Sequence, residues 1–377
     1  MGDIPARLPS RPDVPARPAP PVPAEGGEPG ARSRDAGRHD GAHQPRRPGA
    51  SPRGDPRHFA ALDLGTNNCR LLIARPAAPG ANGGFTVVDA FSRIVRLGEG
   101  LAATGRLSDA AVDRTIAALR VCADKLKRRH VLIARSVATE ACRRATNGAA
   151  FVERALAETG IHLDVISAEE EARLAVLGCH ALIEPGTDPA LVFDIGGGST
   201  ELVLVDTRAE GPGGRPRVLD WHSAPWGVVS LTESAGGGDD PAARVAAYAR
   251  MRATVAEAMA PFAARLPHGV AHPRLLGTSG TVTTLASVHL GLPQYDRSAI
   301  DGLVVPAESM RAISARLSGM SIAERATLPC IGTERADLVV AGCAILETIM
   351  DLWPAARVGI ADRGIREGIL KQLMGNG

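Results

Sequence analysis

The sequence predicts an α/β protein made of two related units, and two observations support that prediction. Residues 61–74 and residues 191–205 share one pattern: an apolar run ends in Asp, a glycine turn follows, and a second apolar run begins. Short apolar runs joined through glycines are typical of β-hairpins. Strand-like and helix-like segments then alternate after each hairpin, which predicts mixed sheets covered by helices. We therefore predict a duplicated domain with a phosphate site between its halves.

In the first unit, three strand-like runs precede alternating helices and strands. The strands are expected at residues 59–62, 71–74, 85–91, 94–97, 131–137 and 162–166. One helix begins after Ser108, a typical N-cap, and has apolar residues at helical spacing. A second helix is expected at about 148–158. The resulting order of elements predicts a mixed sheet with helices packed on it.

The second unit repeats this order roughly. A helix opens at Ser167 and runs to about residue 180, and the glutamates of its first turn complement the helix dipole. Further strands are expected at 218–224, 274–276, 300–305 and 358–360. Ser321 and Glu324 fit a capping box. Helices are expected at about 241–262, 281–290, 306–317, 335–350 and 363–374.

The second hairpin contains most of the candidate site residues. They are Asp194, Gly196, Gly197, Gly198, Ser199 and Glu201. The glycines let a ligand approach closely, and their N–H groups can line an anion site together with the serine hydroxyl. The two acidic residues are hard oxygen ligands suited to Mg²⁺. An ordinary glycine-rich turn is the alternative interpretation.

Two further loops offer similar groups. The first hairpin has an Asp at the strand end, then a glycine and small polar residues, namely Asp63, Gly65, Thr66, Asn67 and Asn68. A third glycine loop leads into a helix-like stretch and contains Gly277, Ser279, Gly280 and Thr281. The recurrence of such loops favours a phosphate-binding function over a chance turn.

Composition narrows the class of protein. The net charge of +2 argues against nucleic-acid binding through a basic surface. The six cysteines show no metal-ligand spacing, which favours reduced thiols. No apolar run approaches the roughly 18 residues of a membrane span. We expect a cytoplasmic protein with neither a membrane nor a nucleic-acid partner.

Residues 1–57 differ from the rest. About half of the 28 prolines lie there, among Arg, Gly and Ala, without apolar periodicity. Such a segment cannot bury enough apolar surface to offset its ordering entropy, so we predict a disordered tail. Two folded units are then expected at residues 58–172 and 173–377.

The motifs together resemble one known family. Asp63-Leu64-Gly65-Thr66-Asn67, Glu170-Glu171-Ala172-Arg173-Leu174 and residues 194–202 are similar to signatures of the Ppx/GppA family of exopolyphosphatases and guanosine pentaphosphate phosphohydrolases. The third glycine loop and residues 362–370 resemble it as well. The resemblance implies duplicated actin/hexokinase/Hsp70-like domains, of the ribonuclease H-like type, around a cleft. It also implies a short form without the family's C-terminal helical domain, with the last helix packed back on the first domain.

The resemblance also implies roles for residues. Glu171 corresponds to the catalytic glutamate, although the adjacent Glu170 leaves the identity of the base open. Asp194 and Glu201 would hold Mg²⁺ or another divalent cation. Arg143 corresponds to an arginine that grips phosphate, with a solvated helix arginine as the alternative. The implied phosphate-binding groups are Asp63, Gly65, Thr66, Asn67, Gly196, Gly197, Gly198, Ser199, Gly277, Ser279, Gly280 and Thr281.

The expected function is hydrolysis of terminal phosphoanhydride bonds. Orthophosphate would be released from inorganic polyphosphate, from guanosine pentaphosphate, or from both, and the sequence leaves this choice open. Two alternatives remain: a small-molecule kinase of the same fold, and a protein that binds polyphosphate or an alarmone without turnover. A homodimer is an oligomeric state that we also consider.

Overall fold

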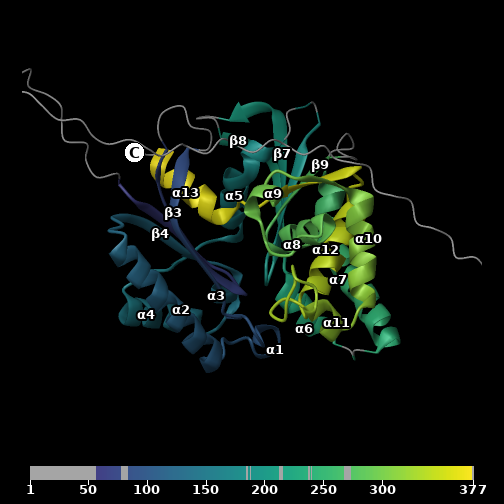
Figure 1. Ribbon diagram of the computed structural model, residues 1–377, viewed down its shortest axis with the longest axis horizontal. Helices are drawn as coiled ribbons and strands as arrows, with labels where there is room; N and C mark the ends of the chain where they lie inside the picture. The colour runs from purple at the N-terminus through teal and green to yellow at the C-terminus, as the bar shows by residue number, and fades with distance from the viewer. Residues whose placement is uncertain are drawn as a thin grey trace, which may run out of the picture. The chain divides into compact units, whose positions relative to one another are not determined.

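The computed structural model describes residues 57–377 except 78–83, 184–185, 187, 212–214, 237, 239, 267–272 and 376–377. The predicted tail therefore lies outside the described residues, apart from Arg57. Among the described residues, none of the helices has the length and apolar character to span a bilayer. The predicted α/β class is confirmed by two mixed sheets with helices packed on them (Figure 1).

The first sheet has five strands in the order β3-β2-β1-β4-β5. Their bounds are β1 (Phe59–Leu64), β2 (Asn68–Pro76), β3 (Phe85–Ile94), β4 (Ile133–Ala138) and β5 (Asp164–Val165). Strands β2 and β3 run antiparallel to their neighbours, whereas β4 and β5 continue parallel to β1. This half thus begins as a meander and ends in parallel pairing, as the order of its elements predicts.

The second sheet has six strands in the order β10-β11-β9-β6-β7-β8. They are β6 (Ala190–Ile195), β7 (Thr200–Gly211), β8 (Arg215–Ala224), β9 (Arg274–Thr278), β10 (Val304–Pro306) and β11 (Arg357–Ala361). Apart from the added edge strand β10, the order and directions match those of the first sheet. The match confirms that one arrangement occurs twice.

Helices of the first half cover its sheet. They are α1 (Leu101–Thr104), α2 (Asp109–Arg128), α3 (Glu140–Arg144), α4 (Gly148–Thr159) and α5 (Ala168–Cys179). Ser108 caps α2, as predicted, because its Oγ accepts the Ala111 N–H at 3.2 Å. The apolar stripe of α2 packs with β1 and β2 in one buried cluster that includes Leu62, Leu71 and Ile116.

Helices of the second half enclose a larger core. They are α6 (Val228–Ala235), α7 (Pro241–Arg265), α8 (Gly280–Leu290), α9 (Arg297–Ile300), α10 (Ala307–Gly319), α11 (Ile322–Ala326) and α12 (Val339–Leu352), with a 3₁₀ turn at His180–Leu182. Phe193 of β6 and Phe262 of α7 are fully buried there. The predicted capping box of Ser321 and Glu324 is present at α11.

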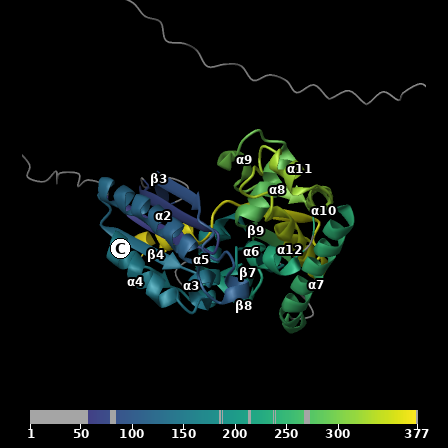
Figure 2. The ribbon, with the colours of Figure 1, turned by 90° about the horizontal axis from the view of Figure 1, so that it is seen from below.

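Two helices connect the halves. The last helix, α13 (Ile365–Gly375), follows β11 of the second sheet but packs against the first sheet, beside α5 (Figures 1 and 2). The two helices approach closely, since a Cβ on Gly178 would lie 2.0 Å from the Gly364 carbonyl oxygen and one on Gly368 would lie 2.1 Å from that of Leu174. Side chains of α5 also pack on the second sheet. The segment that precedes α13 therefore crosses from one half to the other.

Several local predictions differ from the structure. Residues 94–97 do not form a strand, because β3 ends at Ile94 and Arg96 turns the chain with φ of +48°. Helix α12 begins at Val339 rather than residue 335, after a series of turns. The strand expected at 300–305 is reduced to β10, since Gly302 bends the chain with φ of +89°. Helix α6 was not predicted from the sequence.

Candidate active site

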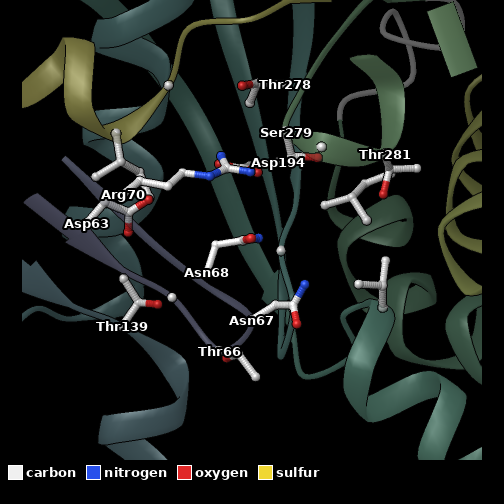
Figure 3. Close-up of a pocket in the computed structure, with 18 of the residues that line it drawn as sticks. Asp63, Thr66, Asn67, Asn68, Arg70, Thr139, Asp194, Thr278, Ser279 and Thr281 are labelled. Carbon is white, nitrogen blue, oxygen red and sulfur yellow. The ribbon is translucent and has the colours of Figure 1, made fainter. Parts of the chain in front are cut away.

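A pocket lies where loops of the two halves meet (Figure 3). Ends of β1, β6 and β9 reach it, together with the first turns of α5, α8 and α13. Among the predicted residues, those that line it are Asp63, Gly65, Thr66, Asn67, Glu171, Asp194, Gly196, Gly197, Gly198, Ser199, Glu201, Ser279, Gly280 and Thr281. The fold thus brings together motifs that are far apart in the sequence.

Gly277 does not line this pocket. It lies within β9, where an added Cβ would be 2.6 Å from Cζ of Phe193 and 2.7 Å from Cγ1 of Val282. The absence of a side chain lets β9 pack tightly against its core neighbours. The structure therefore places Gly277 in the core, away from the phosphate-binding position that the sequence suggested.

Arg143, on the short helix α3, lies behind the pocket and is absent from its lining residues. Its Nη1 donates to Glu171 Oε2 at 2.9 Å and to the Ile166 carbonyl at 2.8 Å. Its Nη2 and Nε donate to Glu140 Oε2 at 2.7 and 3.2 Å. Arg143 thus makes contacts that orient Glu171, and Glu140 is its second ion-pair partner.

Glu171 is buried in the first turn of α5 and faces the pocket. Ser167 caps this helix as predicted, because its Oγ accepts the Glu170 N–H at 3.2 Å. Burial raises the pKa of Glu171 well above its ordinary value, Glu201 raises it further, and Arg143 offsets part of the increase. A raised pKa makes a carboxylate a stronger proton acceptor.

The neighbouring glutamates have different surroundings. Glu170 points away from the pocket and is bound by Arg173 at 2.7 Å and Arg135 at 2.9 Å. Burial opposes ionisation of Glu170, but these two arginines outweigh it, so the pKa of Glu170 is lowered. Glu169 is exposed. Geometry therefore favours Glu171 over Glu170 as the base.

Asp194 and Glu201 lie side by side, since they are paired residues of β6 and β7. Burial raises the pKa of Asp194 to about 6, with Asp63 adding to the rise and Arg70 opposing it. Burial and Asp194 together raise the pKa of Glu201 to about 7, although hydrogen bonds from Ser199 and Ser223 oppose the rise. The Ser223 bond is 2.9 Å long. The hairpin thus gathers negative charge at one place.

This pair of carboxylates suits a divalent cation. In the described part of the chain, no three His, Cys, Asp or Glu side chains are placed to bind one ion. Mg²⁺ is commonly held by only one or two carboxylates, with phosphate oxygens and waters as its other ligands. Asp194 and Glu201 fit that pattern, and a cation there would relieve their mutual repulsion.

The triple-glycine loop is held from behind by α6. The N–H groups of Val228 and Val229 donate to the carbonyls of Gly196 and Gly197 at 2.9 and 2.8 Å. The N–H groups of Gly197 and Gly198 have no hydrogen-bond acceptor among the described residues, which leaves them for a ligand. A Cβ on Gly227, just before α6, would lie 2.4–2.5 Å from this loop. Helix α6 and Gly227 are thus parts of the site that the sequence did not reveal.

Two further polar atoms are available in the pocket. Ser279, before α8, has φ of +95°, and its Oγ is buried without a hydrogen-bond partner among the described residues. Asn67 Oδ1, on the opposite loop, is buried in the same unpartnered state. Buried polar groups normally have partners, so both atoms are candidates for contact with substrate.

Arginines form the remaining part of the wall. Arg70, Arg335, Arg363 and Arg366 line the pocket, and no role was predicted for them from the sequence. Arg70 extends toward Asp194 in Figure 3, and its Nη2 lies 3.6 Å from the position of a Cβ on Gly280. The hairpin register, which pairs Asp63 with Arg70, is the signal that could have identified it. These side chains balance the carboxylates of the pocket and can bind phosphate oxygens.

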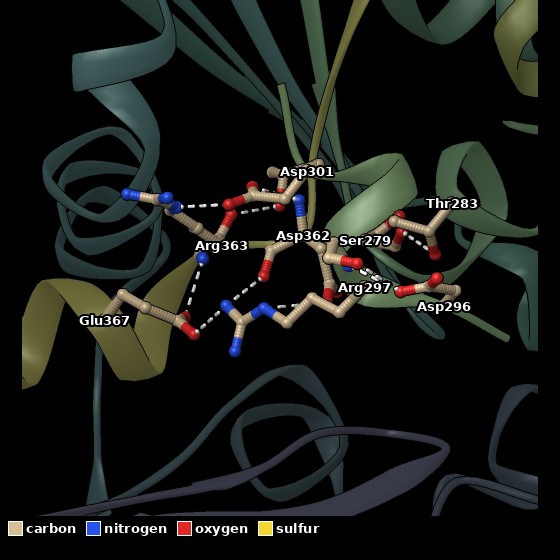
Figure 4. Close-up of polar contacts among 11 residues, drawn as sticks. Ser279, Thr283, Asp296, Arg297, Asp301, Asp362, Arg363 and Glu367 are labelled. Atoms are coloured by element: carbon tan, nitrogen blue, oxygen red, sulfur yellow. Dashed lines mark hydrogen bonds and ion pairs between the residues drawn. The ribbon is translucent and has the colours of Figure 1, made fainter. Parts of the chain in front are cut away.

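An ion-pair network holds the segment that crosses between the halves (Figure 4). Arg297 donates to the Asp362 carbonyl at 2.6 Å and to Glu367 Oε1 at 2.9 Å, and the Gly364 N–H donates to Glu367 Oε2 at 2.9 Å. Arg363 Nε donates to Asp301 at 2.6 Å. Because residues 362–367 line the pocket, the network fixes one of its walls.

The duplicated sheets and the acidic, glycine-lined pocket define the class: an α/β protein of the actin-like, duplicated-domain fold with a site suited to phosphate. The protein-family comparison is more specific, since the Ppx/GppA phosphatase family matches residues 77–376. This chain belongs to the Ppx/GppA phosphatase family, and the predicted resemblance is confirmed.

Individual relatives support the same family assignment. The chain is 34% identical over 325 residues to exopolyphosphatase 2 of Mycobacterium tuberculosis. The alignment covers 84% of this chain and 98% of the relative. A crystal structure of an exopolyphosphatase-like protein superimposes with a TM-score of 0.75 at 28% identity, over 85% of this chain and 99% of that one. The Aquifex aeolicus member of the Ppx/GppA family gives a TM-score of 0.69 at 26% identity, over 86% and 99%.

Proposed function

We propose that this protein hydrolyses terminal phosphoanhydride bonds and releases orthophosphate from inorganic polyphosphate, guanosine pentaphosphate, or both. One observation carries the proposal: a buried glutamate, Glu171, faces the same pocket as the acidic pair Asp194 and Glu201 and the glycine loops of both halves. The similarity to an exopolyphosphatase supports polyphosphate as one substrate.

The glycine loops bind the substrate in this mechanism. Phosphoryl transfer depends mainly on positioning and on neutralising the charge of the transferred group. The free N–H groups of Gly197 and Gly198 would bind phosphate oxygens on one side. Thr66 and Asn67, on the opposite loop, would bind the same chain on the other side.

Glu171 acts as the general base. Arg143 holds its carboxylate in one orientation at 2.9 Å, so that the free oxygen can accept a proton from the attacking water. The raised pKa of Glu171 brings it closer to the operating pH, which favours proton transfer. A divalent cation, Mg²⁺ in our proposal, would be held by Asp194 and Glu201 and would supply charge neutralisation at the phosphate.

Two other functions are compatible with the fold. A small-molecule kinase would need a nucleotide pocket and would transfer phosphate from ATP to an acceptor other than water. A protein that binds polyphosphate or an alarmone without turnover would need no base. The orientation of Glu171 by Arg143 favours hydrolysis over both, because it supplies a positioned proton acceptor for water.

The test is phosphate release with Mg²⁺ from long-chain polyphosphate and from guanosine pentaphosphate, for the wild type, Glu171→Gln and Glu170→Gln. We expect turnover that Glu171→Gln abolishes and Glu170→Gln retains, since Glu170 is paired outside the pocket. Turnover of one substrate alone would settle the choice between them. If the wild type releases no phosphate from either substrate, the proposal is rejected. If Glu171→Gln is as active as the wild type, Glu171 is not the base.

A further inference from the structure

The segment after β3 supports the loop of Thr66 and Asn67 from behind. The N–H groups of Val95 and Arg96 donate to the Asn67 carbonyl at 2.8 and 3.0 Å, and the Gly98 N–H donates to the Thr66 carbonyl at 2.9 Å. The contact is tight, because a Cβ on Gly98 would lie 2.3 Å from Thr66 Cγ2. The position of this segment therefore fixes the position of the loop.

Arg96 is the residue at which the segment turns. Its φ of +48° lies in the left-handed region, which side-chain-bearing residues rarely adopt. Arg114 secures the turn, since its Nε donates to the Val95 carbonyl at 3.1 Å. Rare backbone conformations persist where the surrounding contacts demand them, and they are enriched at functional sites.

The side chain of Arg96 reaches the other half of the protein. Its Nη1 and Nη2 contact the two carboxylate oxygens of Asp337 at 2.9 and 3.3 Å, and Nη2 also donates to the Glu334 carbonyl at 3.3 Å. A bidentate pair of this kind restricts both distance and orientation. Asp337 lies between Arg335 and Leu338, both of which line the pocket. The pair thus connects the two walls of the pocket without entering it.

The loop so held is in direct contact with the opposite wall. A Cβ on Gly197 would lie 2.9 Å from Thr66 Cβ and 3.1 Å from the Asn67 nitrogen. Asn67 also presents the unpartnered Oδ1 to the pocket. A shift of the loop by about 1 Å would change both the width of the pocket and the direction of this oxygen, and shifts of that size cost roughly 100-fold in rate.

From these contacts we propose that Arg96 is a positioning residue: through its pair with Asp337 it holds Thr66 and Asn67 at the distance from the Gly197 loop that substrate phosphate requires. This inference rests on the proposed function. Arg96 acts through Asn67 and does not itself contact substrate.

The experiment compares Arg96→Gly, Arg96→Ala, Asp337→Asn, Arg96→Lys and the reversed pair Arg96→Asp with Asp337→Arg. Glycine adopts the backbone conformation of Arg96 without strain, so Arg96→Gly removes the side-chain contacts with Asp337 and the Glu334 carbonyl but keeps the turn. Arg311→Ala is the matched control, because Arg311 and Asp351 form a 2.7 Å pair of similar exposure outside the pocket. For each variant we would measure kcat and KM with polyphosphate, tripolyphosphate binding by calorimetry, and thermal midpoint.

We expect kcat/KM to fall about 10-fold to 100-fold in Arg96→Gly and in Asp337→Asn. A further variant that combines Arg96→Gly with Asp337→Asn should fall no further than either single change, and the reversed pair or Arg96→Lys should recover part of the loss. Arg311→Ala should keep the wild-type kinetics. Wild-type kcat and KM in Arg96→Gly, or additive effects of the two single changes, would overturn the inference. If Arg96→Ala fails to fold, Arg96→Gly and Asp337→Asn still decide the question.

Tripolyphosphate binding separates this inference from the proposed function. A wild type that binds tripolyphosphate but hydrolyses nothing would reject the function, whereas weaker binding in Arg96→Gly would still support the positioning role. Binding that no variant changes would overturn the positioning role even if hydrolysis is observed. A wild type that binds no tripolyphosphate would contradict both.

Discussion

The first hairpin, β1–β2, and the second hairpin, β6–β7, occupy equivalent places in the two sheets, yet they differ at one decisive position. Asp63 and Asp194 both end the first strand of their hairpin. The residue paired with Asp63 is Arg70, whereas the residue paired with Asp194 is Glu201. The same backbone arrangement therefore presents two oppositely charged side chains in the first half and two carboxylates in the second half.

Neighbouring charged groups increase this difference between the two hairpins. Burial raises the pKa of Asp63, but Arg70 and Arg366 act in the opposite direction. In the second hairpin, burial and Asp194 both raise the pKa of Glu201, and the hydroxyl groups of Ser199 and Ser223 and the charge of Arg143 oppose the rise. The first hairpin neutralises itself, and the second accumulates charge that a cation would balance. Duplication thus supplies the frame, and in our proposal this one position separates a phosphate-binding hairpin from a cation-binding one.

The largest effect is expected from Glu201→Gln, which removes one acid from the second hairpin. We expect kcat/KM to fall by about 100-fold to 1,000-fold, the size seen when one preorganised electrostatic group is lost. The thermal midpoint in EDTA should rise or stay equal, because the change relieves repulsion with Asp194 and Glu171. Phosphate release and thermal unfolding would be measured together. Glu169→Gln, an exposed neighbour of Glu171, serves as control. Full activity with unaltered dependence on divalent ions would contradict the assignment.

A smaller loss of activity is expected from Arg70→Gln, which removes the positive charge from the first hairpin. Hydrogen bonds to charged groups contribute about 1.5–3 kcal/mol, so kcat/KM should fall about 10-fold to 100-fold, mainly through KM. Steady-state kinetics with polyphosphate would show the split. Arg75→Gln provides the control, since Arg75 lies on the same strand and is exposed away from the pocket. An unchanged KM would argue against phosphate binding by Arg70.

The sequence revealed the parts of this comparison that are local. Asp, glycines and the flanking apolar runs determine each hairpin within about 15 residues, so both hairpins were predicted correctly, each with an aspartate near the end of its first strand. The caps at Ser108, Ser167 and Ser321 are equally local. Patterns of this kind depend on hydrogen bonds and periodicity between near neighbours, which a single sequence displays.

The parts that were missed depend on contacts between distant residues. Nothing near Arg143 in the sequence shows that it would contact Glu171. Likewise, nothing near Arg96 indicates that it would turn the chain and pair with Asp337. Gly277 resembled a ligand-binding glycine, although its lack of a side chain serves packing against Phe193. Tertiary contacts decided each of these, and they are not visible in local patterns.

Substitutions of glycine by alanine should have different effects on stability in the two hairpin loops. Gly197→Ala should destabilise the protein by about 1–3 kcal/mol, because its Cβ would collide with Thr66 and Asn67 across the pocket. Gly65→Ala should change stability by less than about 1 kcal/mol, since its Cβ would meet only the Asn68 carbonyl oxygen at 3.7 Å. Free energies of unfolding in urea would test this. Equal stability of the two variants would mean that the loops do not touch as described.

An effect on stability that depends on pH is expected at Glu367, a buried carboxylate whose situation is opposite to that of Glu201. Burial opposes its ionisation, but Arg366, the Gly364 N–H and Arg297 outweigh burial, so the pKa of Glu367 lies below its ordinary 4.5. A lowered pKa in the folded state adds stability that is fully present above pH 4.5 and is lost as the pH falls through the folded value. Glu367→Gln should therefore reduce the free energy of unfolding by about 1–3 kcal/mol at neutral pH.

The difference from wild type should then shrink in urea titrations between pH 5 and pH 3. Glu308→Gln is the matched control, because Glu308 also occupies the first turn of a helix but is exposed. Its difference from wild type should be small and nearly independent of pH. A Glu367→Gln penalty that grows toward low pH would show that the pKa of this carboxylate is raised, as it is for Asp194 and Glu201. It would also remove Arg297 and Arg366 as the groups that stabilise its charge.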